Sequence, residues 1–479
     1  MIKTFKNFVA GRFVDDSRQE TIEVRNPANN EILAYVPEAS SDIVAEAVAA
    51  ARKAQPAWER LPAIQRAGYL RRISAKIREN KERLAEIITR EQGKTLGLAR
   101  VEVDFTADYI DYTSEWARRI EGEVIPSDRV GESIFLMRRA IGVTVGILPW
   151  NFPFFLIARK LAPALITGNT IVIKPSEETP INAFEFAQLL SETDLPPGVF
   201  NLLGGRGATV GSQLTTNPHV DMVSFTGSVA TGIQIMRSAA DNMTRVNLEL
   251  GGKAPAIVLA SADLDLAVKA ICDSRVLNTG QVCNCPERVY VERSVAAEFT
   301  DKVKTQMAGV RFGDPMVDQN VDMGPLVNAA GLNKVSAMVK QARTDGAEVI
   351  LGGDLAKLDG GYHYLPTVIA GCRPDMEIMR KEIFGPVLPI QTVDSLEEAI
   401  VHANDSEYGL TSSIFTRDLN KAMQACNALR FGETYVNREH FEAMQGFHAG
   451  RRHSGIGGAD GKHGLLEYTD TQVVYMMHG

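Results

Sequence analysis

Between residues 141 and 250, short apolar strands alternate with helices, and no other feature of the sequence constrains the fold as strongly. The predicted strands cover 143–148, 170–173, 200–203 and 222–225, and the helices between them cover 154–166, 180–191 and 208–215. Such alternation is typical of βαβ units, which build a doubly wound parallel sheet. A second alternating block runs from Ala256 to about residue 436. The sequence therefore predicts an α/β protein of two interleaved domains.

The segments around this sheet differ from it in pattern. Residues 42–118 are predicted to be helical, because one apolar stripe recurs there at spacings of three, four or seven residues. Residues 122–126 and 132–137 are expected to form extended strands that belong to neither neighbouring block, and 471–476 is a similar strand. Outlying strands of this kind often cross to another subunit, whereas fraying termini are the simpler alternative.

Composition and charge argue against several classes of protein. The 479 residues are 45% hydrophobic and 23% charged, which suits two or three globular domains. The net charge of −8 argues against a nucleic-acid partner, which would require a basic face. Neither a signal peptide nor an apolar run of about 18 residues is present, so we expect no membrane association. The five cysteines follow neither a disulfide framework nor a zinc spacing, which predicts reduced thiols, a cytoplasmic location and no metal.

Two glycine turns are candidates for binding a dinucleotide. Strand 222–225 runs into a turn where Gly227 would let the backbone approach a pyrophosphate and Ser228 could donate a hydrogen bond. Gly207 and Gly211 belong to a second turn of this kind. Taken alone, either turn is more often structural.

A charged loop follows strand 170–173 and is a third candidate. Lys174 and Glu177 are both placed to hydrogen-bond ribose hydroxyls at the end of that strand. A carboxylate there would repel a 2′-phosphate, so Glu177 favours NAD over NADP. A solvated ion pair is an equally good interpretation of the two side chains.

Three further segments carry candidate catalytic groups. Cys283 follows a predicted helix and Gly280, and its thiolate would suit attack on a carbonyl carbon. Glu249 lies between two leucines, an apolar setting that suits a general base. Asn151 caps strand 143–148, where its amide could donate to a developing oxyanion. Singly, a buried cysteine, a surface glutamate and a turn-forming asparagine are the more ordinary interpretations.

The order of these segments is far more specific than any one of them. In chain order they are Pro149-Trp150-Asn151, Lys174-Pro175-Ser176-Glu177, Phe225-Thr226-Gly227-Ser228, Glu249-Leu250-Gly251-Gly252-Lys253, Gly280-Gln281-Val282-Cys283 and Glu382-Ile383-Phe384-Gly385-Pro386. Together they resemble the aldehyde dehydrogenase superfamily, as do the 23 residues from Asn151 to Lys174 and the 34 from Glu249 to Cys283. The resemblance covers essentially the whole chain.

This resemblance implies an α/β aldehyde dehydrogenase fold with three parts. A Rossmann-like NAD-binding domain would comprise residues 1–119 and 141–250, and an α/β catalytic domain would comprise residues 251–455. A small β oligomerisation flap would comprise residues 120–140 and 456–479. The resemblance also implies NAD as the cofactor and a homo-oligomer, either a dimer or a tetramer.

The family's motifs assign roles to individual residues. Cys283 would be the nucleophile, Glu249 the base that activates water, and Asn151 with the backbone N–H of Cys283 the oxyanion hole. Cys285 would be a bystander. The residues expected to contact the cofactor are Leu148, Trp150, Lys174, Ser176, Glu177, Gly207, Gly211, Phe225, Gly227, Ser228, Lys334, Glu382 and Phe384. Within that set the resemblance assigns the adenosine ribose to Lys174 and Glu177, the pyrophosphate to Ser228, and the nicotinamide side to Glu382 and Phe384.

Within the family, the chain looks closest to the bacterial lactaldehyde (glycolaldehyde) dehydrogenases. The segments behind this comparison are Val282-Cys283-Asn284-Cys285, the loop 437–448 and the glycine-rich stretch 455–461. The resemblance implies a substrate tunnel with polar groups, and the expected substrate-binding residues are Arg159, Asn284, Glu442 and His448. Polar groups that would cost energy if left unpaired suit a small hydroxylated substrate, L-lactaldehyde or glycolaldehyde.

Some features leave alternatives open. Arg159 could pair with Glu442 and merely shape a wall, and Arg452 stands where the family commonly has lysine. The same mechanism would serve a semialdehyde such as succinic semialdehyde, with Arg159 holding its distal carboxylate. A CoA-acylating relative would typically lack Glu249, and a non-enzymatic binding protein would have no need of the complete set of Cys283, Glu249 and Asn151.

Overall fold

An eight-stranded sheet forms the centre of the first half of the chain. The computed structural model describes residues 2–16, 20–358 and 360–478. In spatial order the strands of this sheet are β20 (Gly455–Ile456), β12 (Arg245–Glu249), β11 (Met222–Thr226), β8 (Val143–Ile147), β9 (Thr170–Lys174), β10 (Phe200–Leu202), β2 (Asn7–Val9) and β3 (Arg12–Val14). The five strands from β12 to β10 are parallel, and antiparallel strands flank them at both edges. The prediction of a parallel sheet is therefore confirmed.

Helices cover both faces of this sheet, as a doubly wound fold requires. They are α1 (Ser41–Arg60), α2 (Ala63–Glu79), α3 (Lys81–Gln92), α4 (Leu96–Ser114), α5 (Phe155–Thr167), α6 (Ile181–Ser191), α7 (Ser212–Thr215) and α8 (Val229–Ala240). Neighbouring side chains of β9 point to opposite faces: Ile171 packs into the core shared with α2 to α6, whereas Val172 packs into the core shared with α1. Every residue of α5 is buried, including Arg159 and Lys160, so these two charged side chains need partners inside the protein.

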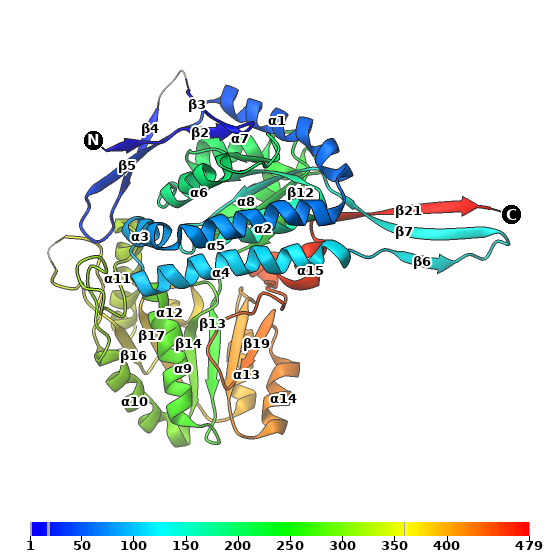
Figure 1. The fold of residues 1–479 in the computed structure, drawn as a ribbon. Helices are drawn as coiled ribbons and strands as arrows, with labels where there is room; N and C mark the ends of the chain where they lie inside the picture. Colours follow the sequence, from blue (N-terminus) through cyan, green and yellow to red (C-terminus); the bar gives the residue numbers. More distant parts are fainter. Residues whose placement is uncertain (1, 17–19, 359, 479) are drawn as a thin grey trace.

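A seven-stranded sheet forms the centre of the second block. Its spatial order is β15 (Glu348–Leu351), β16 (Thr367–Ala370), β17 (Val387–Val393), β14 (Pro286–Glu292), β13 (Ala254–Val258), β18 (Thr411–Phe415) and β19 (Glu433–Val436). All neighbours pair in parallel except β15 and β16. Its helices are α9 (Leu264–Val276), α10 (Ala296–Ala308), α11 (Ala329–Thr344), α12 (Glu377–Arg380), α13 (Leu396–Asn404) and α14 (Leu419–Ala428). In Figure 1 the two blocks occupy the upper and lower halves of the view.

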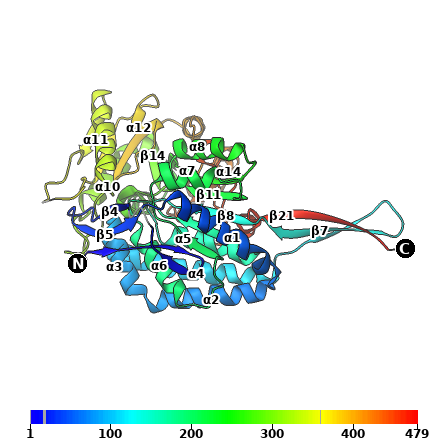
Figure 2. The same cartoon turned by 90° about the horizontal axis from the view of Figure 1, so that it is seen from above.

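The outlying strands predicted from the sequence form a sheet of their own. Strands β6 (Glu123–Pro126), β7 (Glu132–Ala140) and β21 (Thr469–Met477) pair antiparallel, and β7 matches β21 over nine residues. This three-stranded arm projects from the rest of the protein (Figures 1 and 2). The arm carries exposed apolar side chains, among them Val124 and Tyr475.

The segment just before β21 lies on the body of the protein and not in the arm. Helix α15 (Gly461–Leu466) follows β20, and Leu465 and Tyr468 pack in the core formed by α2 to α6. In the C-terminal segment of the predicted flap, 456–479, the part that projects therefore begins at Thr469.

Five N-terminal strands have no counterpart in the sequence prediction. Strands β1 (Lys3–Thr4), β4 (Thr21–Arg25) and β5 (Ile32–Pro37) form a small sheet, while β2 and β3 extend the large one. These strands are two to six residues long and pair with distant segments, as Phe8 does with Leu202. Their short apolar patterns carry too little information to predict a strand.

None of the helices among the described residues is long and apolar enough to cross a membrane.

Candidate active site

A cavity collects side chains from both α/β blocks. The segments after β8, β11 and β12 reach it with Pro149 to Phe152, Thr226 to Ser228 and Glu249 to Gly251. Cys283 and Asn284, which precede β14, line the same cavity. Ligands of open parallel sheets bind beyond the carboxyl ends of the strands, where these three segments lie. The structure thus brings together the catalytic candidates Cys283, Glu249 and Asn151.

A strained turn positions Cys283. After helix α9, three consecutive residues are left-handed: Asn278 (φ 49°), Thr279 (φ 60°) and Gly280 (φ 73°). A Cβ on Gly280 would lie 2.2 Å from the carbonyl oxygen of Gly385, so only glycine fits there. A left-handed backbone conformation costs energy at a residue other than glycine, and such residues are concentrated at functional sites.

The two neighbouring thiols differ in environment. Cys283 is partly exposed and lines the cavity, whereas Cys285 is buried and lies 3.1 Å from the Arg275 guanidinium. Burial raises the pKa of Cys285 to about 12. Only Cys283 of the two is therefore placed to react with a small molecule.

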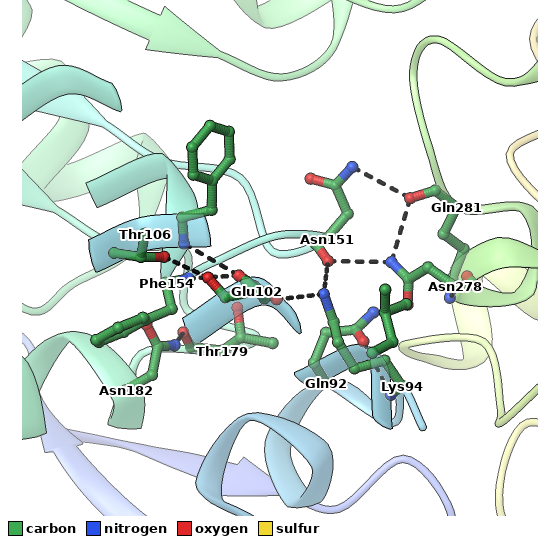
Figure 3. Close-up of polar contacts among 12 residues, drawn as sticks. Gln92, Lys94, Glu102, Thr106, Asn151, Phe154, Thr179, Asn182, Asn278 and Gln281 are labelled. Atoms are coloured by element: carbon green, nitrogen blue, oxygen red, sulfur yellow. Dashed lines mark hydrogen bonds and ion pairs between the residues drawn. The ribbon is translucent and has the colours of Figure 1, made fainter. Parts of the chain in front are cut away.

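Asn151 is fixed through both its side chain and its backbone (Figure 3). Its Nδ2 donates to the carbonyl oxygen of Gln281 at 3.1 Å. Its own carbonyl oxygen accepts from Lys94 Nζ at 2.7 Å and from Asn278 Nδ2 at 3.0 Å. The amide is therefore tied to the turn that positions Cys283.

A buried ion pair completes this support. Lys94 Nζ lies 2.5 Å from Glu102 Oε2, and both side chains are 0% exposed. The other oxygen of Glu102 accepts from the backbone N–H groups of Phe154 at 2.9 Å and Phe155 at 3.1 Å, where helix α5 begins. Burial lowers the pKa of Lys94, although Glu102 opposes that shift. Nothing in the sequence pattern indicated this pair, because its partners meet only in the folded chain.

We expect Lys94→Met to lower the free energy of unfolding by about 3–5 kcal/mol, because it leaves the Glu102 carboxylate buried without its cation. Lys81→Met is the matched control: Lys81 is 34% exposed and lies 2.6 Å from Asp104. Its loss should cost less than about 1 kcal/mol. Urea denaturation followed by circular dichroism measures both values. Equal losses in the two variants would contradict a structural role for Lys94.

Glu249 is buried in an unusual way. It ends β12, and neither carboxylate oxygen has a hydrogen-bond partner among the described residues. The nearest cations are Arg159, at 3.6 Å, and His448, at 3.9 Å. A buried carboxylate without hydrogen bonds is costly, so this group is poised to accept one from water in the cavity.

Arg159, Glu442 and Asn284 form a polar wall of the same cavity. Arg159 donates to Glu442 Oε1 at 3.0 Å and forms two hydrogen bonds with Asp460, at 3.1 and 2.5 Å. Asn284 Nδ2 donates to the other oxygen of Glu442. The pairing of Arg159 with Glu442, weighed from the sequence as an alternative, is present. All three wall residues nevertheless line the cavity.

His448 is not among the residues that line the cavity. Its side chain is 1% exposed, and Nδ1 donates to Glu433 Oε1 at 2.5 Å. It also interacts with the Cys283 thiol. Burial works to lower the pKa of His448, but Glu249, the thiol and Glu433 together raise it well above its usual value. For the Cys283 thiol, burial raises the pKa, and His448 opposes that shift.

The residues predicted to contact a dinucleotide fall into two groups. Those that line the cavity are Trp150, Gly227, Ser228, Lys334, Glu382 and Phe384. Those that lie outside its lining are Leu148, Lys174, Ser176, Glu177, Gly207, Gly211 and Phe225. In the second group, Glu177 meets Lys174 Nζ at 3.5 Å and the backbone N–H of Gly207 at 3.4 Å. The charged loop and the second glycine turn are therefore neighbours.

The cavity group has specific contacts of its own. The rings of Trp150 and Phe384 meet edge to face at 5.4 Å. Ser228 caps helix α8 by accepting from the backbone N–H of Thr231 at 3.2 Å. Glu382 Oε1 accepts from the backbone N–H of Gly252 at 2.8 Å, and burial raises the pKa of Glu382 to about 7.

Sequence reasoning missed several aromatic residues that line the cavity. They are Phe105, Phe155, His440 and Phe441. The guanidinium of Arg159 lies 4.8 Å from the centre of the Phe155 ring, one helical turn earlier. That spacing, and the place of His440 and Phe441 beside Glu442, were usable signals in the sequence.

Comparisons with known proteins agree on one family. The profile described as "Aldehyde dehydrogenase family" matches residues 13–474. Lactaldehyde dehydrogenase of Escherichia coli (strain K12) is 58% identical over 469 residues, covering 98% of both chains. The NADP(+) succinate-semialdehyde dehydrogenase of the same organism is 36% identical over 471 residues, covering 98% of this chain and 97% of the relative.

Solved structures give the same result. A crystal structure of lactaldehyde dehydrogenase from Escherichia coli has a TM-score of 0.98, with 58% identity and 100% of both chains covered. Betaine aldehyde dehydrogenase from Staphylococcus aureus in complex with NAD+ has a TM-score of 0.96 at 34% identity, covering 99% of this chain and 95% of that one. The fold implied by the sequence motifs is therefore confirmed.

Proposed function

This chain belongs to the aldehyde dehydrogenase family, and from that membership and the geometry of the cavity we propose that it oxidises a small hydroxyaldehyde with NAD. The proposed substrates are L-lactaldehyde and glycolaldehyde. The observation that carries the choice of substrate is the polar wall of Arg159, Glu442 and Asn284 beside Cys283. Such a wall suits a substrate that brings a hydroxyl group to pair with it.

NAD fits the groups that the cavity offers. Ser228 and the first backbone N–H groups of α8 suit a pyrophosphate, because a helix N-terminus attracts anions. The carboxylate of Glu382 and the rings of Trp150 and Phe384 line the same cavity as that turn and Cys283, and they suit the ribose and nicotinamide. When bound, NAD supplies the acceptor for the hydride that leaves the substrate carbon.

The preference for NAD over NADP rests on Glu177. Its side chain is partly exposed and lies beside Lys174 and Gly207. We assign the adenosine ribose to these residues, with Leu148, Ser176, Gly211, Phe225, Gly227 and Lys334 as further cofactor contacts. The Glu177 carboxylate can accept hydrogen bonds from ribose hydroxyls and would repel a 2′-phosphate.

Cys283 begins the reaction as a thiolate. Its sulfur forms a bond to the aldehyde carbon while the carbonyl electron pair moves to oxygen, which gives a thiohemiacetal. We assign stabilisation of that oxyanion to the Asn151 amide and the backbone N–H of Cys283. Because Lys94 and Asn278 tie down the backbone of Asn151, this donor is preorganised.

Glu249 acts in the second half of the reaction. Loss of hydride leaves a thioester on Cys283, which water must hydrolyse. Glu249, whose oxygens lack hydrogen-bond partners among the described residues, removes a proton from that water. The water oxygen bonds to the thioester carbon, the C–S bond breaks, and Cys283 leaves as a thiolate with release of the acid.

The alternative substrate, a semialdehyde, has weaker support. Its distal carboxylate would require a cation with free donors in the pocket. Arg159 already pairs with Glu442 and Asp460, and Glu249 lies 3.6 Å from it. A further carboxylate at this place would meet three acidic side chains, so the charge balance favours a neutral hydroxyaldehyde.

The remaining assignments complete the proposal. We assign NAD binding to residues 1–119 and 141–250, catalysis to 251–455, and oligomerisation to the flap of 120–140 and 456–479. The arm carries exposed apolar side chains on strands with free edges, which suits contact with another copy in a dimer or tetramer. All five cysteines are free thiols, which suits a reducing cytoplasm.

A panel of kcat/KM values tests the substrate and cofactor. We expect L-lactaldehyde and glycolaldehyde with NAD to exceed succinic semialdehyde and benzaldehyde by at least about tenfold, or roughly 1.4 kcal/mol of transition-state binding. Absorbance of NADH or NADPH at each substrate concentration gives the values. A preference for the semialdehyde would indicate that Arg159 binds the distal carboxylate of the substrate. A preference for NADP would contradict the role assigned to Glu177.

A further inference from the structure

A buried histidine, His448, pairs with the partly buried Glu433 and also interacts with the proposed nucleophile. His448 Nδ1 donates to Glu433 Oε1 at 2.5 Å, and the same imidazole interacts with the Cys283 thiol. Its Nε2 also lies 3.9 Å from Glu249 Oε2. One imidazole therefore interacts with the proposed nucleophile, with the proposed base Glu249 and with a second carboxylate, Glu433.

The pair is held firmly in place. The backbone N–H of His448 donates to Ala459 at 2.9 Å, and the N–H of Ala459 donates back at 2.8 Å. Tyr435 donates its hydroxyl proton to the second oxygen of Glu433. Since burial and Glu433 both raise the pKa of Tyr435, that phenol stays neutral and remains a donor. Glu433 is thus fixed at both of its oxygens.

The surrounding charges favour a cation at this position. The ionisable groups that act on His448 or are acted on by it are Cys283, Glu249, Glu433, Glu442, Asp460 and Arg159. Four of them are carboxyl groups, and Arg159 is the one fixed cation among the six. An imidazolium at His448 therefore offsets negative charge that burial would otherwise make costly.

We propose that His448, oriented by Glu433, is a buried imidazolium that stabilises the Cys283 thiolate. The proposal rests on the proposed function only in taking Cys283 as the nucleophile. His448 acts on the reacting thiol itself, whereas Glu433 is a positioning residue that acts through His448. Without this cation, Arg159 would be left to oppose the desolvation of the thiolate at the cavity wall.

Alkylation of Cys283 tests this directly, because iodoacetamide reacts with the thiolate and needs neither aldehyde nor NAD. The full-length protein is labelled from pH 5 to pH 10, and mass spectrometry reports the rate at Cys283. We expect His448→Gln to move the midpoint of the rate profile up by at least one pH unit, which is about tenfold slower labelling at a fixed lower pH. Glu433→Gln, which removes the charge but keeps an acceptor, should move it in the same direction by less.

A second histidine–glutamate pair supplies the matched control. His402 Nε2 lies 3.4 Å from Glu398 Oε1 on helix α13, in the second block. His402→Gln and Glu398→Gln should leave the profile of Cys283 unchanged. Cys426, a partly buried thiol on α14, is an internal reference whose profile should be the same in every variant.

The outcomes separate this inference from the proposed function. An unchanged midpoint in folded His448→Gln overturns the role of His448 even if the enzyme oxidises hydroxyaldehydes. Should that variant fail to fold, the midpoint of Glu433→Gln decides, and no shift there overturns the proposal. A shifted midpoint in a protein that oxidises none of the aldehydes would support the imidazolium and count only against the proposed substrate.

Discussion

Replacing Cys283 with alanine should lower kcat/KM for aldehyde oxidation by at least about four orders of magnitude, as loss of a covalent nucleophile does. No other described thiol can substitute for it. Cys285 is two residues away but buried against Arg275, and its pKa is raised to about 12. NADH production at saturating aldehyde and NAD measures the loss.

Cys285→Ala is the control for that experiment. It removes a neighbouring thiol of the same size while leaving Cys283 in the cavity, so the folded protein should keep most of its activity. If Cys285→Ala were inactive and Cys283→Ala active, the assignment of the nucleophile would be reversed. Comparable activity in both variants would exclude a thioester mechanism.

Replacing Glu249 with glutamine should slow turnover by about 10²–10⁴-fold, the range expected for loss of a general base. The first hydride transfer should remain, because Cys283 and Asn151 are unchanged. A stopped-flow experiment would then show a burst of NADH close to one per active site, followed by a slow steady state. Hydrolysis of the thioester needs a group that accepts a proton from water. The oxygens of Glu249 can do so because no described residue donates a hydrogen bond to them.

The size of the burst decides between two roles for Glu249. A burst of wild-type size with a slow second phase supports a role in hydrolysing the thioester. Loss of the burst would show that Glu249 acts before hydride transfer, for example by helping to form the Cys283 thiolate. Glu398 is a partly exposed carboxylate on helix α13, and Glu398→Gln should leave both phases unchanged.

The candidate catalytic residues could be predicted from the sequence because each lies in a short segment with a recognisable pattern. Asn151 follows strand β8, Glu249 ends β12, and Cys283 follows helix α9 and the turn after it, so each lies at a boundary that the local sequence pattern indicates. The parallel sheet then brings such ends to one edge, whatever the details of packing. For the same reason the strands of the arm were predicted close to their observed ranges, from Glu123 and Glu132 onward.

The supporting part of the site was not accessible in this way. Lys94 and Asn151 are 57 residues apart, yet the lysine donates to the asparagine carbonyl. That His448 contacts the substrate stays a prediction. The sequence did not indicate that its side chain pairs with Glu433 and lies near Glu249, and Glu433 itself was not singled out. Each of these contacts joins segments that have no relation in sequence pattern.

By itself, the sequence determined the α/β class and the parallel sheet, because hydrophobic periodicity encodes them locally, and its short motifs predicted the reactive groups. The tertiary structure alone decided which charges share the buried space around Cys283. Burial makes each unpaired charge costly, so Lys94 is paired with Glu102, Arg159 with Asp460 and His448 with Glu433, at separations of 8, 301 and 15 residues in the chain. That matching is a property of packing, and no single segment of the chain contains it.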